Sequence, residues 1–495
     1  MLESAELGQT VSDEEYAAAA PDLRVELLGA QYDLMDLSSF AAVVLVNGVD
    51  GAGRSETVNL LNEWMDPRHI ATWAFDEPTA DEAAHPFMWR FWRALPPRGK
   101  IGVLYDNWYT DPIRDRVERR TKRAQLAHRL EAIRRFEAML VNDGVLVLKF
   151  WFQLSKSAQK QRLKALEKDE RTSWRVTERD WHFYDLHERY CDVASEALQA
   201  THCAHAPWLI VDGTDANYRE LFVARELLAA LRSRLDGGGE QVAPAAAPPD
   251  AMPARDEDIV AGLDAIVRQN LGRKEYETLL EPEQGRLARL LRRPQFARRS
   301  LVLVFEGMDA AGKGGAIRRV AAALDARRYR IVPIAAPSEQ ELVQPYLWRF
   351  WQRVAPQGRV VMFDRSWYGR VLVERVEGFC SEADWQRAYG EINEFEQELR
   401  EHGAIVIKFW LAISKEEQLE RFEEREAQAH KYYKITPDDW RNRDKWDAYA
   451  DAVRDMVGRT HTAVAPWTLV EADDKHYGRI KILRTICERL EAELI

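Results

Sequence analysis

Cysteine is scarce in this sequence, with only four among its 495 residues. Cys191, Cys203, Cys380 and Cys487 show neither the CxxC spacing of common zinc sites nor the dense pattern of a small disulfide-linked domain. The sequence therefore disfavours a disulfide scaffold, and we expect free thiols in a reducing compartment.

Long hydrophobic runs and an excess of positive charge are also missing. No stretch approaches the roughly 20 apolar residues of a membrane span, and the first residues, MLESAELGQTVSDEEY, lack the features of a secretory signal. The 70 Lys and Arg against 81 Asp and Glu give a formal net charge of −11. Proteins that bind nucleic acid over a large surface are usually basic, although a local basic cleft stays compatible with this charge. We therefore expect a cytoplasmic protein that binds neither nucleic acid nor a membrane.

The sequence repeats itself with a constant offset of 259 residues. The word WRFW begins at Trp89 and again at Trp348, and the word KFW begins at Lys149 and again at Lys408. A constant offset in words that contain tryptophan indicates a tandem duplication. Tryptophans three residues apart in WRFW are typical of a helix that packs into a core.

The composition changes abruptly between the two copies. Residues 236–256, DGGGEQVAPAAAPPDAMPARD, are rich in Gly, Ala and Pro without an apolar period, which is typical of a linker. We predict one domain at 1–235, a linker at 236–256 and a second domain at 257–495. These outer ranges are called the N-terminal copy and the C-terminal copy below.

Each copy has the pattern of an α/β fold. In the C-terminal copy, apolar runs at 300–305, 359–363, 404–411 and 467–470 alternate with segments typical of helices. Continuous apolar runs predict strands that are buried on both faces, and hence a mostly parallel, doubly wound sheet flanked by helices. Ligands bind at the carboxyl ends of the strands in such folds.

A phosphate-binding loop is predicted at one such strand end. GMDAAGK at 307–313 has the GxxxxGK spacing, in which backbone N–H groups, a helix N-terminus and a lysine, here Lys313, attract phosphate oxygens. Gly314 replaces the Ser or Thr that usually binds Mg²⁺, so Asp309 is the candidate metal ligand. A turn that only packs a strand against a helix is the alternative. We predict phosphate binding by Gly307, Ala310, Ala311, Gly312 and Gly314.

An acidic residue and two arginines follow the next conspicuous apolar run. VVMFDRSWYGR at 360–370 places Asp364 at a strand end, which is the Walker-B position that holds a magnesium ligand in P-loop NTPases. Arg365 and Arg370 suit the negative charge of a phosphoryl transition state. A helix N-cap and surface ion pairs are the alternatives. We predict a catalytic set with Asp309 and Asp364 as metal ligands, consisting of Asp309, Lys313, Asp364, Arg365 and Arg370.

A third basic segment lies further along the chain. Arg421 and Arg425 are four residues apart and share one face of a predicted helix, and Lys431 and Lys434 follow. Such a segment resembles a kinase lid that closes over phosphates and excludes water. A charged helix that is simply solvated is the alternative.

The motifs GMDAAGKGG, DRSWYGR, ISKEEQLERFEER and APW, in this order, resemble the second polyphosphate kinase family. The resemblance is close over 257–495 and looser over 1–235, and the duplicated architecture is similar to the subgroup that converts AMP to ADP. It implies tandem P-loop kinase domains of the thymidylate-kinase type with a helical lid. It also implies Mg²⁺-dependent phosphoryl transfer between inorganic polyphosphate and a nucleotide (AMP or ADP). We expect the chains to form a homo-oligomer.

The N-terminal copy departs from its own motif. Its loop, GVDGAGRS at 48–55, has Arg54 where the C-terminal copy has Lys313, and the planar guanidinium does not replace a compact ammonium. Asp106 is expected to match Asp364, with Asn107 in place of Arg365. Further replacements, by Thr110, Leu166 and Thr172, are expected opposite Gly369, Arg425 and Lys431. We therefore predict that 1–235 is a degenerate kinase-like domain, inactive or weakly active, with a structural or polyphosphate-tethering role. The catalytic domain is predicted at 257–495.

The sequence favours a phosphotransferase with polyphosphate as donor and a nucleoside monophosphate as acceptor. The alternatives are an ATP-dependent nucleoside monophosphate kinase, a polyphosphate kinase that acts on nucleoside diphosphates, an NTP-hydrolysing switch and a polyphosphate-binding scaffold. The missing Ser or Thr after Lys313 disfavours the switch. The sequence separates neither AMP from ADP or GMP nor a loop-bound donor from a loop-bound acceptor.

Overall fold

The computed structural model describes residue 2 and residues 6–237, 252–428 and 435–495, and the chain divides into two compact units. Unit 1 comprises Met1–Pro78, Arg90–Ala246 and Ser338–Trp348, and unit 2 comprises Thr79–Trp89, Ala247–Pro337 and Arg349–Ile495. Each unit therefore includes a short segment from the other sequence copy. Most of the predicted linker at 236–256 lies outside the described residues, and the predicted domain boundaries stay predictions.

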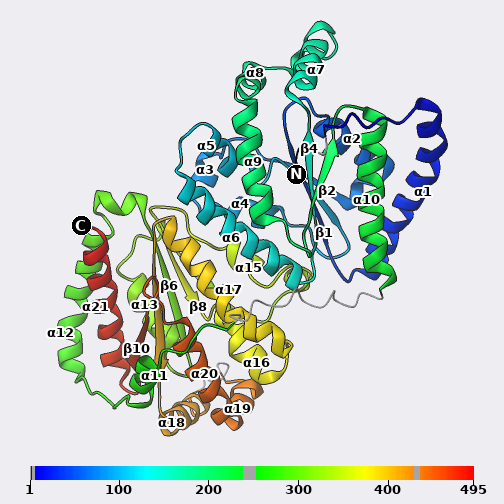
Figure 1. The fold of residues 1–495 in the computed structure, drawn as a ribbon. Coiled ribbons are helices and arrows are strands. Elements are labelled where there is room, and N and C mark those ends of the chain that lie inside the picture. Colours follow the sequence, from blue (N-terminus) through cyan, green and yellow to red (C-terminus); the bar gives the residue numbers. More distant parts are fainter. Residues whose placement is uncertain (1, 3–5, 238–251, 429–434) are drawn as a thin grey trace. The chain divides into compact units, whose positions relative to one another are not determined.

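Both units are built on a five-stranded parallel sheet, as expected from the continuous apolar runs (Figure 1). The sheet of unit 1 has the order β2-β3-β1-β4-β5, and that of unit 2 has the same order from its other edge, β10-β9-β6-β8-β7. The α/β prediction is confirmed for both copies. The strands are β1 (Ala42–Gly48), β2 (Ile70–Ala74), β3 (Ile101–Tyr105), β4 (Leu146–Gln153), β5 (Trp208–Asp212), β6 (Ser300–Gly307), β7 (Tyr329–Pro333), β8 (Val360–Asp364), β9 (Ala404–Ala412) and β10 (Trp467–Glu471).

Helices connect the strands in both copies, since parallel strands need crossover connections. Those of the N-terminal copy are α1 (Asp13–Leu37), α2 (Arg54–Trp64), α3 (Ala80–Ala83), α4 (Trp89–Ala94), α5 (Thr110–Val117), α6 (Arg123–Asn142), α7 (Lys156–Lys168), α8 (Glu178–Asp185), α9 (His187–Thr201) and α10 (Ala216–Asp236). Those of the C-terminal copy are α11 (Glu257–Asp264), α12 (Arg273–Leu290), α13 (Lys313–Ala321), α14 (Glu339–Leu342), α15 (Trp348–Trp351), α16 (Val373–Glu377), α17 (Glu382–Glu401), α18 (Lys415–Glu426), α19 (Pro437–Asp444), α20 (Trp446–Thr460) and α21 (Lys475–Glu493). Short 3₁₀ turns are η2 (Pro67–His69), η3 (Ser173–Arg175), η4 (Pro294–Arg298) and η5 (Trp367–Val371).

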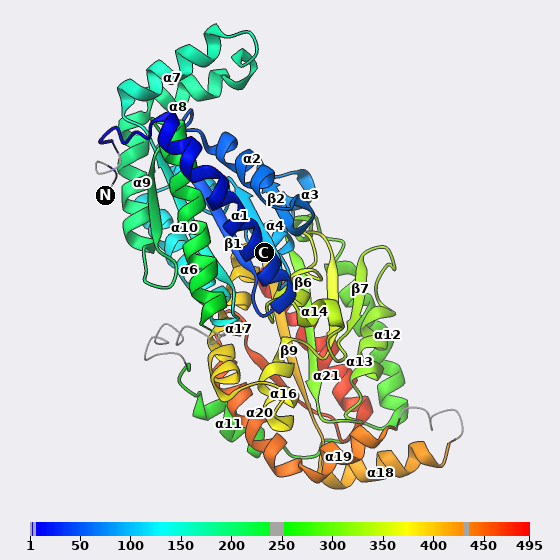
Figure 2. The same cartoon turned by 90° about the vertical axis from the view of Figure 1, so that its right-hand side faces the viewer.

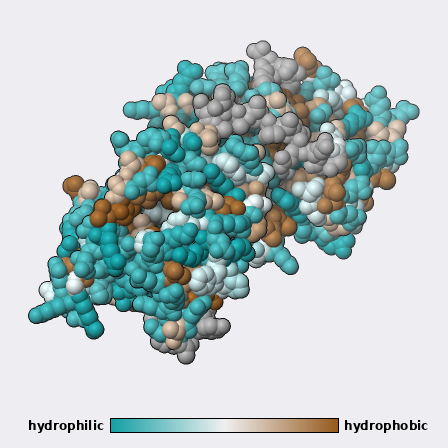
Figure 3. Space-filling view, turned by 90° about the horizontal axis from the view of Figure 1, so that it is seen from below, coloured by the Kyte–Doolittle hydropathy of each residue, from teal (hydrophilic) through white to brown (hydrophobic). Residues whose placement is uncertain are grey.

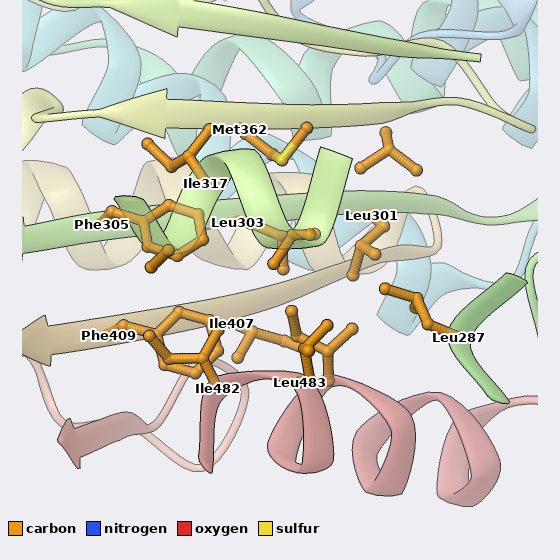
Figure 4. Close-up of a cluster of buried hydrophobic side chains, with 14 of the residues drawn as sticks. Leu287, Leu301, Leu303, Phe305, Ile317, Met362, Ile407, Phe409, Ile482 and Leu483 are labelled. Atoms are coloured by element: carbon orange, nitrogen blue, oxygen red, sulfur yellow. The ribbon is translucent and has the colours of Figure 1, made fainter. Parts of the chain in front are cut away.

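The first long helix of each copy packs against the last one. Figures 1 and 2 show α1 beside α10 in one unit and α12 beside α21 in the other. The core of unit 2 lies between its sheet and such helices, and Figure 4 shows side chains of β6 and β9 meeting those of α13 and α21. Removing one such buried side chain typically costs about 2–5 kcal/mol. This core holds the carboxyl ends of β6 and β8 in place. The loop follows β6, and Asp364 is the last residue of β8.

The strand register corrects one sequence expectation. Phe305 pairs with Asp364, and at the equivalent place Val46 pairs with Tyr105. Tyr105 therefore occupies the position of Asp364, and Asp106 occupies that of Arg365. Both Asp106 and Arg365 also adopt positive φ angles, 46° and 63°. The expected match of Asp106 with Asp364 is wrong by one residue.

A buried ion pair is repeated in both copies. Lys408 Nζ lies 2.8 Å from Glu396 Oε2 and donates to the Tyr368 hydroxyl and to the carbonyl of Thr460 at 2.9 and 2.6 Å. Burial lowers the pKa of Lys408. The same contacts recur in the N-terminal copy, where the lysine–carboxylate distance is 2.7 Å, among Lys149, Glu137, Tyr109 and Thr201. We therefore assign this network to the fold rather than to the chemistry.

The WRFW motifs supply core residues, as their spacing predicts. The Trp92 and Trp351 side chains are fully buried, and Trp89 is buried as well. On the face seen in Figure 3, hydrophilic residues predominate and hydrophobic residues form small groups. Among the helices of the described residues, none combines the length and the apolar character that crossing a bilayer requires.

Candidate active site

The loop between β6 and α13 owes its shape to two glycines. Gly307 has a φ of +152°, and a Cβ atom there would lie 2.6 Å from the carbonyl oxygen of Leu411. Gly312 has a φ of +103° and is the N-cap of α13. Side chains are disfavoured at both positions, by the backbone conformation and, at Gly307, by the close approach of β9. The loop therefore ends at a helix N-terminus, whose N–H groups and dipole favour anions.

Lys313, the first residue of α13, folds back over the loop. Its Nζ atom donates to the carbonyl oxygens of Gly307 and Met308 at 2.6 and 3.2 Å. Burial lowers the pKa of Lys313, and the charge of Arg365 lowers it further. The ammonium thus lies among the atoms of the loop, and its contact with phosphate stays a prediction.

Asp309 is held by two donors from other parts of the chain. Arg365 Nη2 donates to Asp309 Oδ1 at 2.7 Å, and Asn442 Nδ2 donates to Oδ2 at 2.9 Å. Burial would raise the pKa of Asp309, but the charges of Lys313 and Arg365 and these hydrogen bonds lower it on balance. Asp309 is therefore held as a carboxylate in a defined orientation.

Asn442 and its partner Tyr449 were not singled out in the sequence. The Tyr449 hydroxyl donates to Asn442 Oδ1 at 3.2 Å, which orients the amide so that its nitrogen faces Asp309. The repeat could have indicated Asn442, because the residue at the equivalent position of the N-terminal copy, 259 residues earlier, is Phe183. A polar residue in one copy and an apolar one in the other indicates a difference in chemistry.

Asp364 ends β8 beside the loop. Its Oδ2 atom lies 3.8 Å from the point where a Cβ on Gly314 would be, so the carboxylate reaches toward the place of the usual Ser or Thr. Mg²⁺ commonly uses one or two carboxylates together with waters and substrate phosphates. Within the described ranges, no group of three or more His, Cys, Asp or Glu side chains forms a ready-made metal cage. Asp309 and Asp364 are the candidate carboxylates for such an ion, and this role stays a prediction.

A third acidic residue lies near the loop and was not predicted from the sequence. Glu306 is buried at the end of β6, and Ser366 Oγ donates to its Oε1 atom at 2.8 Å. Burial raises the pKa of Glu306, while Ser366 and the charge of Lys313 oppose that rise. In the N-terminal copy two amides take these places, and Asn107 Nδ2 donates to Asn47 Oδ1 at 2.8 Å.

Arg421 is bound to other groups of the protein, mostly backbone carbonyls. Its guanidinium donates to the carbonyl oxygens of Ala310, Ala472 and Asp473 at 2.9, 2.7 and 2.8 Å, and it pairs with Glu417 at 2.7 Å. These bonds fasten the loop to α18 and to the segment after β10. Arg421 has a loop-supporting role in this geometry, and its predicted contact with phosphate stays a prediction.

The remaining predicted residues are placed as follows. Arg370 lies in η5 and forms an ion pair with Glu374 at 2.7 Å. Arg425 lies near the end of α18 and is half-buried. Lys431 and Lys434 lie outside the described residues, so the lid is only partly described.

The equivalent loop of the N-terminal copy has a different charge arrangement. Arg54 donates to Asp106 Oδ1 at 2.8 Å and to Asp50 Oδ1 at 2.6 Å, and Arg114 donates to the second oxygen of Asp106 at 3.1 Å. A carboxylate thus stands where the C-terminal copy has the Arg365 guanidinium. A cavity of about 310 Å³ remains beside this loop, but a phosphate there would meet carboxylates that already neutralise Arg54.

Comparisons with known proteins place these observations in a family. The family model described as Polyphosphate kinase 2 matches residues 10–236 and 270–495. The chain is 51% identical over 492 residues to the polyphosphate:AMP phosphotransferase of Pseudomonas aeruginosa, covering 99% of each chain, and 39% identical to that of Acinetobacter johnsonii, covering 95% and 96%. A crystal structure from P. aeruginosa named as a polyphosphate kinase 2 superposes with a TM-score of 0.89 at 49% identity, over 100% of this chain and 99% of that one. This chain therefore belongs to the polyphosphate kinase 2 family.

Proposed function

We propose that this protein transfers a phosphoryl group from inorganic polyphosphate to AMP and so forms ADP. The observation that carries the proposal is the arrangement at the C-terminal loop, where Lys313, Arg365 and Asp309 meet at the N-terminus of α13. Two relatives that match the chain over nearly its whole length bear the name polyphosphate:AMP phosphotransferase, which supports this choice of substrates.

The reaction needs positioning and charge stabilisation more than covalent catalysis. An oxygen of the AMP phosphate forms a bond to the terminal phosphorus of polyphosphate, and the bond from that phosphorus to its bridging oxygen breaks. The shortened polyphosphate leaves with the electron pair. The attacking phosphate is already ionised at neutral pH, so we assign no general base. Lys313 and Arg365 stabilise the negative charge of the migrating group.

We propose Mg²⁺ as the cofactor, held by Asp309 and Asp364 together with phosphate oxygens. When bound, such an ion neutralises phosphate charge. Arg370, Arg425, Lys431 and Lys434 complete the proposed phosphate-facing set. For the N-terminal copy we propose a structural or polyphosphate-tethering role, because carboxylates neutralise its loop arginine.

The proposed setting is the cytoplasm and the proposed state is a homo-oligomer. Free thiols fit a reducing compartment, and Cys191, Cys203, Cys380 and Cys487 are free. Light scattering on the purified chain measures its oligomeric state directly.

The donor and the acceptor are tested in one assay. Purified protein receives Mg²⁺ and AMP with either polyphosphate or ATP, and nucleotides are separated by chromatography, with Lys313→Ala as the control for contaminating kinases. We expect ADP from polyphosphate and AMP. ADP formed with ATP as donor but not with polyphosphate would establish the ATP-dependent kinase instead. Faster transfer from polyphosphate to ADP or GDP than to AMP would establish the kinase that acts on nucleoside diphosphates.

A further inference from the structure

The C-terminal copy contains a cavity at the amino ends of its strands. The cavity has a volume of about 460 Å³ and is lined by the end of α12, the turn between α13 and β7, and the residues that lead into β8. Figure 4 shows Leu287 and Leu301 at this end of the core. Val360 begins β8 and lines the cavity, whereas Asp364 ends β8 beside the phosphate-binding loop. A strand rises about 3.3 Å per residue, so the length of β8, about 13 Å, separates the cavity from the candidate active site.

The lining of the cavity is partly apolar and partly basic. Apolar side chains from three segments form its walls: Ala288, Leu291, Phe296, Ala323, Leu324 and Val360. Three further lining residues, Arg292, Arg328 and Arg359, are exposed, and we call them the rim arginines. Sites for small molecules commonly measure about 300–1,000 Å³ and combine apolar walls with a few convergent polar groups. The cavity therefore has the size and the lining of a ligand site.

The rim arginines are not neutralised by the protein. Among the described residues that line the cavity, the only carboxylate is that of Asp325, and it lies 2.7 Å from Arg327 Nη2. The hydrogen bonds of Arg327 lower the pKa of Asp325, so this carboxylate is ionised and already paired. Within the described ranges, no carboxylate forms an ion pair with a rim arginine. Positive charges without counter-charges raise the local potential and attract an anion.

The N-terminal copy shows that the fold does not need this cavity. The turn at 66–68 has the same hydrogen bonds as the turn at 325–327, since in each an aspartate accepts from the backbone N–H and the guanidinium of an arginine. Two residues before the aspartate, the N-terminal copy has the buried Trp64 where the C-terminal copy has Ala323. The larger side chain fills space that the C-terminal copy leaves open.

Helix α1 also bonds directly to this turn in the N-terminal copy. Gln31 Nε2 donates to the carbonyl oxygen of Asp66 at 2.9 Å, and Gln31 Oε1 accepts from the Asp66 N–H at 2.7 Å. The Tyr32 hydroxyl donates to Asp66 Oδ2 at 3.0 Å. In the described part of the C-terminal copy, no hydrogen bond joins α12 to the turn at 325–327, and the cavity lies between them. The C-terminal copy thus has an open cavity with basic residues where its duplicate has a closed contact, a difference that a ligand explains and the fold does not.

We propose that this cavity binds a nucleoside diphosphate, at a site separate from the place of phosphoryl transfer. The rim arginines come from three different segments and so suit more than one phosphate group, which guanidinium groups bind through paired N–H donors. The apolar walls suit the base, whose faces also stack on guanidinium groups. Inorganic polyphosphate would use only the rim arginines and an acyl chain only the walls, whereas a nucleotide uses both.

Photolabelling tests where the nucleotide binds. An azido derivative of ADP is irradiated with the purified protein, and labelled peptides are identified by mass spectrometry. We expect label on peptides from 288–296 or 322–329 of the wild type. Ala323→Trp introduces the residue of the N-terminal copy and should abolish this label, while thermal unfolding verifies that the variant is folded. No label on these peptides in the wild type, or undiminished label in Ala323→Trp, would overturn the inference.

A second variant keeps the cavity and removes its charge, by Arg292→Gln, Arg328→Gln and Arg359→Gln together. The concentration of the azido derivative that gives half-maximal labelling of these peptides should rise about tenfold or more, because charge-assisted hydrogen bonds are lost. A matched variant removes three other exposed cations that form no ion pair within the described residues: Arg98→Gln, Lys164→Gln and Arg225→Gln. It should be labelled as the wild type is. Identical labelling of the two variants would show that the rim arginines do not bind the phosphates, against the inference.

Competitors separate the two parts of the ligand. ADP should protect these peptides from labelling better than pyrophosphate, which lacks the nucleoside, and better than adenosine, which lacks the phosphates. Equal protection by pyrophosphate would identify a site for inorganic polyanions, and equal protection by adenosine would leave the rim arginines without a role. Either result would contradict the inference. Labelling needs no phosphoryl transfer, so a protein that is labelled here but forms no ADP from AMP and polyphosphate would count against the proposed function alone.

Discussion

The two copies of this chain share one fold but differ in the charges around one loop. Both keep the buried lysine–glutamate network, and in both a glutamine supports the loop, since Gln418 Nε2 and Gln159 Nε2 donate to the carbonyls of Asp309 and Asp50 at 3.0 Å each. In the C-terminal copy the guanidinium of Arg365 faces the loop aspartate. In the N-terminal copy the carboxylate of Asp106 stands at the position of Arg365, and the loop residue Arg54 pairs with both carboxylates. The shape of a phosphate-binding loop can therefore persist without the charges that phosphate requires.

This comparison separates fold from function within one molecule. Features that both copies keep, such as the ion pair of Lys408 and its duplicate at Lys149, are explained by packing in the core. Features confined to the C-terminal copy, such as Lys313, Arg365 and Asn442, surround Asp309 or its loop. A duplicated chain thus supplies its own control for assigning residues to chemistry.

The largest effect is expected from comparing Lys313→Ala with Arg54→Ala. Loss of the loop ammonium should lower kcat about 100- to 1,000-fold, because charge stabilisation of the migrating phosphoryl group is removed. Arg54→Ala should leave kcat within a few-fold of wild type, although it removes the Arg54 partner of Asp50 and leaves Asp106 with Arg114 alone, and it should lower the melting temperature. Initial rates of ADP formation and thermal unfolding measure both effects. Equal losses of kcat would show that both copies are active.

Lys408→Met and Lys149→Met are expected to lower the stability of the protein, and by similar amounts. Each change leaves a buried glutamate uncompensated, which typically costs about 3–5 kcal/mol. The free energy of unfolding in urea should fall by similar amounts in the two variants. If Lys408→Met lowered kcat in well-folded protein while Lys149→Met did not, the network would belong to the chemistry and the comparison would fail at this point.

The smallest effect is expected from Asn442→Phe, which introduces the residue that the N-terminal copy has at the equivalent position, Phe183. Loss of the bond to Asp309 Oδ2 should lower kcat about tenfold, in line with one hydrogen bond to a charged group. The KM for AMP should change little, and Asn442→Asp should not rescue activity because it places a second carboxylate beside the first. Phe183→Asn is the matched control and should leave the rates unchanged. A change in the melting temperature without a change in kcat would assign Asn442 to stability.

Much of the candidate site was predictable from the sequence, because local patterns carry it. The loop follows a strand and precedes a helix, so Asp309 and Lys313 could be placed from spacing alone. Asp364 and Arg365 follow a strand, and adjacent parallel strands end at one edge of a sheet. Arg421 was predicted as a phosphate-facing lid residue on a helix face, not as a buried residue whose donors bind backbone carbonyls.

By itself, the sequence determined the duplication, the α/β class and the position of the phosphate loop, since these depend on periodicity and on glycine at defined positions. The constant offset of 259 residues already pairs Tyr105 with Asp364 and Asp106 with Arg365, and the strand register agrees with it. Only the tertiary structure decided that Asn442 reaches Asp309 and that Arg421 donates to the carbonyl oxygen of Ala310. Such contacts join residues that are far apart in the chain, and no local pattern specifies them; packing around the sheet brings them together.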